Sequence, residues 1–90
     1  MNATQRLIEL AMTRQGLTKR SDVARLANWT RARLSNYTRG VSQADEEAAK
    51  ELAQLAGVPV DYAILLIEAD RVKSERVRKV LLNAAERLAA

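Results

Sequence analysis

The chain has 90 residues, no cysteine, no histidine and a formal net charge of +4. This length suits one small domain and leaves little room for a large catalytic cleft. Without cysteine or histidine, disulfides, thiol nucleophiles and nearly all zinc sites are excluded, so we expect no enzyme activity, no metal, no cofactor and no small-molecule ligand. No apolar run approaches the ~18 residues of a membrane span and no signal peptide is evident, which predicts a cytoplasmic protein.

The charges are segregated along the chain. Residues 1–40 carry a net charge of +6, residues 41–70 carry −6 and residues 71–90 carry +4. A surface that serves solubility alone mixes both signs, so this segregation favours a basic N-terminal face that binds a polyanion. A solvated basic face without a partner is the alternative that charge alone leaves open.

Apolar residues recur at intervals of three and four, a spacing that predicts helices and no strands. In chain order, helices are predicted over about residues 3–15, 19–27 and 31–39, then from the stretch 42–45 to about residue 56, and over about residues 60–72 and 75–88. The first is expected to be capped by Asn2 or Thr4. The stretch Ser42–Asp45 is expected to form a capping box, with Asp45 at the third helical position. Residues 60–90 contain neither Gly nor Pro, so one long bent helix is the alternative to the last two helices.

A turn of about three residues separates the second and third predicted helices. Asn28 stands in this turn, where the chain needs a positive φ, and asparagine tolerates that conformation better than most residues. Thr30 can cap the third helix. Trp29 is expected to fill the space between the helices, with the other inward-facing positions at Ala24, Leu34 and Tyr37. Two helices joined in this way form a helix-turn-helix, whose second helix lies in the major groove of DNA.

The segment LTKRSDVARLANWTRARLSNYTRG, residues 17–40, resembles the DNA-binding unit of the Cro and phage-repressor (lambda-repressor-like, XRE) family. The matching positions are Ala24, Asn28, Trp29, Thr30, Leu34, Tyr37 and Arg39-Gly40, with Asn28 standing where the family has glycine. The resemblance implies an all-α fold. A five-helix domain would cover residues 1–69, with its motif at 19–39 and its recognition helix at 31–39, and a C-terminal helical extension would cover 70–90.

The resemblance also implies roles for side chains around the third helix. Base contacts are expected on the face opposite Leu34 and Tyr37, from Arg31, Ala32, Arg33 and Asn36. Arginine pairs with guanine, asparagine pairs with adenine, and an alanine methyl contacts the methyl group of thymine. Contacts to the DNA backbone are expected from Arg20, Thr30, Ser35 and Arg39.

The last predicted helix carries an apolar stripe of Val77, Leu81, Ala84 and Leu88. This stripe either packs onto its own domain or forms a dimer seam, and the sequence leaves both interpretations open. A two-fold dimer would set two recognition helices ~34 Å apart, one turn of B-DNA, and would bind a palindromic operator.

These features predict a sequence-specific DNA-binding transcriptional regulator, specifically a small phage- or prophage-type repressor that binds double-stranded DNA as a homodimer. An excisionase-like factor and an autoregulating antitoxin would use the same chemistry. The alternative from a different class is a protein-interaction module on a helix-turn-helix fold, which would dock through the acidic middle helix and the last helix. Arginines on the third helix favour the DNA-binding interpretation.

Overall fold

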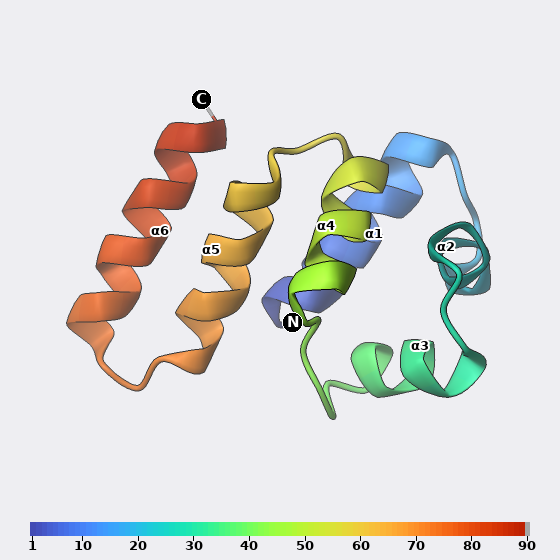
Figure 1. Ribbon diagram of the computed structural model, residues 1–90, viewed down its shortest axis with the longest axis horizontal. Coiled ribbons are helices and arrows are strands. Elements are labelled where there is room, and N and C mark those ends of the chain that lie inside the picture. The colour runs from blue at the N-terminus through green and yellow to red at the C-terminus, as the bar shows by residue number, and fades with distance from the viewer. Residues whose placement is uncertain (90) are drawn as a thin grey trace.

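The computed structural model describes residues 1–89, which form six α-helices and no strand (Figure 1). The helices are α1 (Ala3–Gln15), α2 (Arg20–Ala27), α3 (Arg31–Thr38), α4 (Glu46–Ala56), α5 (Val60–Arg71) and α6 (Glu75–Ala89). The segment after Pro59 therefore forms two helices, as predicted, and Ser74 Oγ accepts a hydrogen bond of 3.2 Å from the Val77 N–H at the start of α6. Within the described residues, every helix is too short or too polar to cross a lipid bilayer.

The helices are arranged along a long axis of 36 Å (Figure 1). α1 and α4 pack against each other in the middle, and α5 packs against both. α2 and α3 lie at one end of the molecule, and α6 lies at the other end (Figure 1). In the part of the chain that the structure describes, α6 packs against α5 and no other helix.

The core lies between α1, α2, α4 and α5. Its largest fully buried side chains include Leu7 and Ile8 of α1, Val23 of α2 and Leu52 of α4. Burial of each such side chain stabilises the fold by roughly 1.5–3 kcal/mol, so these residues hold the four helices together. The helical spacing of these residues was the signal that predicted the helices.

The caps of α1 and α4 differ in how well the sequence predicted them. Asn2 caps α1 and forms a capping box with Gln5, which confirms one of the two predicted caps. At α4 the prediction was wrong, because Asp45 is itself the N-cap and accepts a hydrogen bond of 2.8 Å from the Ala48 N–H. Aspartate caps a helix as well as serine does, and the Ser42 N–H instead bonds the Asn36 carbonyl.

The turn between α2 and α3 has the predicted geometry. Asn28 adopts the left-handed conformation, with φ 60° and ψ 41°, and it is the sole non-glycine residue with positive φ among residues 1–89. Its N–H bonds the carbonyls of Ala24 and Arg25, which closes the end of α2. Thr30 follows as the N-cap of α3, and its Oγ1 accepts a hydrogen bond of 3.1 Å from the Arg33 N–H. α2 and α3 are thus joined at a fixed corner.

We predict that Asn28→Ala lowers the free energy of unfolding by about 1–2 kcal/mol, because a Cβ-bearing residue other than Asn or Asp is strained in the left-handed region. Asn28→Gly is the matched control and should be at least as stable as the parent, since glycine has no such strain. Urea unfolding monitored by circular dichroism measures both changes. Equal stability of the two variants would contradict the strain at this position.

Candidate nucleic-acid interface

An aromatic pair anchors α3 to the rest of the domain. Trp29 is 8% exposed and Tyr37 is 4% exposed, and their rings meet edge to face with centroids 5.1 Å apart. Leu34 is half-buried and packs against the same core. The structure therefore confirms the predicted inward face of α3. Among the described residues, no group accepts a hydrogen bond from the buried Trp29 Nε1, so this ring contributes through packing.

The opposite side of α3 faces solvent. Arg31 and Ala32 are exposed in its first turn, and Asn36 is half-buried one turn later. Arg39, the residue that ends the helix, donates from Nε to Ser35 Oγ at 3.1 Å and from Nη2 to Asn36 Oδ1 at 3.2 Å. These five residues form the outer face of α3. The structure thus brings together three of the four predicted base-reading residues and two of the predicted backbone contacts.

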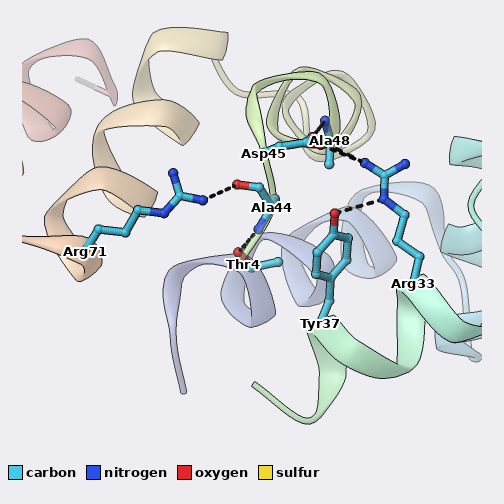
Figure 2. Close-up of polar contacts among 7 residues, drawn as sticks. All are labelled: Thr4, Arg33, Tyr37, Ala44, Asp45, Ala48 and Arg71. Carbon is cyan, nitrogen blue, oxygen red and sulfur yellow. Dashed lines mark hydrogen bonds and ion pairs between the residues drawn. The ribbon is translucent and has the colours of Figure 1, made fainter. Parts of the chain in front are cut away.

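Arg33 does not lie on this outer face, and its predicted position opposite Tyr37 was wrong. Its Nε–H donates to the Tyr37 hydroxyl at 3.0 Å, and its Nη2 lies 3.3 Å from both carboxylate oxygens of Asp45 (Figure 2). The reason is helical geometry, since residues four apart lie on the same side of a helix. Its guanidinium therefore turns toward α4 rather than toward the open face.

The surroundings of Arg33 favour its charged form. The hydrogen bond to the Tyr37 hydroxyl raises the pKa of Arg33, and the nearby carboxylates of Asp45 and Glu51 add to this effect while partial burial opposes it. An arginine is already protonated at neutral pH, so the guanidinium is a permanent cation at this position.

Arg20 lies at the first turn of α2, where it was predicted to contact the DNA backbone. Its Nη2 forms an ion pair of 2.9 Å with Glu9 of α1, and both side chains are largely exposed. Arg20 and Thr38 line the same shallow cavity of 130 Å³, which places Arg20 beside the C-terminal end of α3. A surface pair of this kind contributes at most about 1 kcal/mol, so Arg20 can exchange Glu9 for another anion.

The C-terminal end of α3 is tied to α1. Gln5 Nε2 donates to the Thr38 carbonyl at 2.9 Å, and Gly40, with φ 74°, turns the chain away from the helix. The N–H groups of Val41 and Ser42 then bond the Asn36 carbonyl. The last turn of α3 therefore has partners for its free carbonyls and keeps a fixed position.

The connection from α3 to α4 is held by helices on both sides. The Ala44 N–H donates to Thr4 Oγ1 of α1 at 3.0 Å, and the Ala44 carbonyl accepts from Arg71 Nη2 of α5 at 3.1 Å (Figure 2). Gln43 bonds Thr4 and also Asp70 of α5. These anchoring residues were not predicted from the sequence, because they bond across 27 to 40 positions of the chain and no local pattern identifies such pairs.

The helix-turn-helix family model matches residues 8–62, which include α2, the turn, α3 and α4. The chain belongs to the Cro/repressor-type (XRE) helix-turn-helix family. Members of this family are DNA-binding regulators, so the chain is a DNA-binding helix-turn-helix protein. No curated protein and no solved structure matched the chain.

α6 lies beyond the residues of the helix-turn-helix match, and its predicted stripe is divided by the packing on α5. Leu81 and Ala84 are half-buried, whereas Val77 and Leu88 are exposed at 45% and 43%. Val80, which the sequence analysis did not single out, is 63% exposed. Leu81 and Ala84 therefore help to complete the fold, and the edge formed by Val77, Val80 and Leu88 is open to solvent.

Proposed function

We propose that this protein is a sequence-specific transcriptional regulator whose recognition helix α3 lies in the major groove of double-stranded DNA. One observation carries the proposal. The aromatic anchor of Trp29 and Tyr37 holds α3 at the surface, while Arg31, Ala32 and Asn36 face outward on its other side. A helix presented in this way has the shape and the side chains for reading base edges.

Each outward residue matches a base by its chemistry. Arg31 can pair with O6 and N7 of a guanine, and the Ala32 methyl can contact the methyl group of a thymine. Asn36 can accept from and donate to an adenine. The bond from Arg39 to Asn36 Oδ1 occupies one of two lone pairs on that oxygen, so the amide can still pair with an adenine.

The phosphate contacts come from residues around the outer face. Thr30, Ser35 and Arg39 flank the reading residues, and Arg20 lies beside the far end of α3. These contacts fix the position of the protein on the duplex and carry no sequence information. The net charge of +6 over residues 1–40 favours the binding of a polyanion by this part of the protein.

Substitution of a base-reading residue and substitution of a phosphate-contacting residue should change DNA binding in different ways. We first propose to select a duplex that the purified protein enriches from a randomised pool. Arg31→Ala should then cost about 1–3 kcal/mol at one base pair of each half-site and relax selectivity there. Arg39→Ala should weaken binding to all duplexes alike.

Fluorescence anisotropy against the selected duplex and its single-base variants measures these changes. If both variants bound every duplex like the parent, α3 would not be the reading helix. If the parent enriched no duplex at all, the DNA-binding function would fail, and a protein-interaction module would account for the fold instead.

We further propose that the protein binds a palindromic operator as a homodimer, in the manner of a small phage- or prophage-type repressor. The support is the open edge of α6, where Val77, Val80 and Leu88 expose apolar surface beside Arg76 and Arg87. Apolar side chains gathered on one edge of a helix that packs against a single neighbour are typical of an interaction site. Two-fold symmetry then sets two half-sites a whole number of DNA turns apart, at ~34 Å per turn.

Val80→Glu tests the dimer with little risk to the fold, because Val80 is far more exposed than Leu81. We expect a folded monomer that binds the selected duplex at least tenfold more weakly, since each half-site must then be bound without its partner. The matched control is Leu82→Glu, whose side chain lies about 200° further around α6. Sedimentation measures the oligomeric state of both variants, and circular dichroism measures whether they are folded. A dimeric Val80→Glu variant, or a monomeric parent on and off DNA, would contradict the proposal.

A further inference from the structure

The guanidinium of Arg33 is held by two elements at once. It donates to Tyr37 of its own helix and pairs with Asp45, the N-cap of α4 (Figure 2). Its Cζ atom also lies 5.8 Å from the ring centroid of Trp29 and 5.8 Å from that of Tyr37. A cation over two aromatic faces gains further attraction from their π electrons. The hydrogen bond to Tyr37, the ion pair with Asp45 and the two cation–π contacts therefore hold the Arg33 side chain in one direction.

The pair with Asp45 joins two helices whose backbones stay apart. Among residues 1–89, the backbone of α3 comes close to α1 and α2 but not to α4, and the core side chain of Tyr37 belongs to the same apolar cluster as Leu52 of α4. The Arg33–Asp45 pair thus spans the side of α3 that faces α4, while Gln5 secures its C-terminal end from α1. Loss of the pair would remove the polar link on this side of α3 and leave the aromatic anchor and Gln5 as its remaining restraints.

We propose that Arg33 is a positioning residue, which with Asp45 and Tyr37 holds α3 at the angle required for reading DNA and contacts no base itself. This inference rests on the proposed function of α3. Recognition demands that reading side chains lie within about 0.5 Å and 10–20° of their productive geometry. α3 has only eight residues, and packing sets its place through Trp29 and Tyr37, so a side-chain link to α4 adjusts the angle of a short helix.

Substitution of Asp45 distinguishes a positioning role of the Arg33–Asp45 pair from a direct effect of its charges on the DNA. A carboxylate near the DNA repels phosphates, so its removal should leave affinity unchanged or raise it if charge alone mattered. If Asp45 helps to position α3, removal of its carboxylate should instead lower the affinity for DNA. Asp45→Asn preserves the cap of α4, because asparagine is an equally good N-cap, and it breaks the ion pair by replacing one carboxylate oxygen with an NH2 group that cannot accept from Arg33.

We propose to compare Arg33→Ala, Tyr37→Phe and Asp45→Asn on the selected duplex. Each should weaken binding by about fivefold, the scale of one surface ion pair, with the dependence on salt unchanged. The loss should affect every base pair that α3 reads, and binding to unrelated DNA should change less. The double variant Arg33→Ala/Asp45→Asn should bind no more weakly than Arg33→Ala, because both substitutions remove the same link.

Two outcomes on DNA would overturn the proposal. Arg33→Ala could relax selectivity at one base pair while Asp45→Asn has no effect, which would make Arg33 a base reader. Alternatively, Arg33→Ala could reduce the slope of log affinity against log salt by about one, which would make it a phosphate contact. A parent protein that binds no duplex would instead count against the proposed function.

Amide hydrogen exchange of the free protein tests the link without DNA. Arg33→Ala and Asp45→Asn should speed exchange in α3 several-fold and leave α6 unchanged, since local opening depends on local contacts. Arg25→Ala is the matched control, because Arg25 pairs with Asp22 at the same distance of 3.3 Å but within α2. Unchanged exchange in α3 for both test variants would overturn the positioning role whatever the protein binds.

Discussion

The edge-to-face contact between Trp29 and Tyr37 determines which side of α3 is available to a partner. Trp29 follows directly on the left-handed residue of the turn, and Tyr37 lies near the end of the helix, so the two rings fix the helix at both of its ends. Burial of two aromatic side chains contributes more to the fold than any polar contact on this surface. Arg31, Ala32 and Asn36 face outward as a consequence of this burial.

The polar contacts around α3 refine a position that packing has already set. Gln5 holds one end of the helix, and Arg33 links its flank to Asp45. The segment that follows is bonded to α1 through Thr4 and to α5 through Arg71 (Figure 2). Each contact is individually weak, but together they join α3 and the segment that follows it to α1, α4 and α5.

The sequence predicted the parts of the fold that depend on local chemistry. The spacing of apolar residues predicted the helices, Asn28 predicted the turn between α2 and α3, and Thr30 predicted the cap of α3. The errors arose where more than one residue could cap a helix, or where contacts between distant parts of the chain determine the position of a side chain. Ser42 and Asp45 can both cap a helix, and α4 begins at the second because the chain before it bonds α1 and α5. The spacing of Arg33 and Tyr37 could have revealed their bond, but nothing local indicated the pair with Asp45.

If basic residues 1–40 bind DNA through its phosphates while the outer face of α3 reads bases, affinity must depend on both salt and sequence. The decisive measurement is the affinity of the purified protein for its selected duplex and for a scrambled duplex as a function of salt concentration. We expect a preference for the selected duplex and a slope of log affinity against log salt of about −0.9 for each phosphate neutralised. Equal affinity for both duplexes, or an affinity that does not change between low and physiological salt, would contradict it.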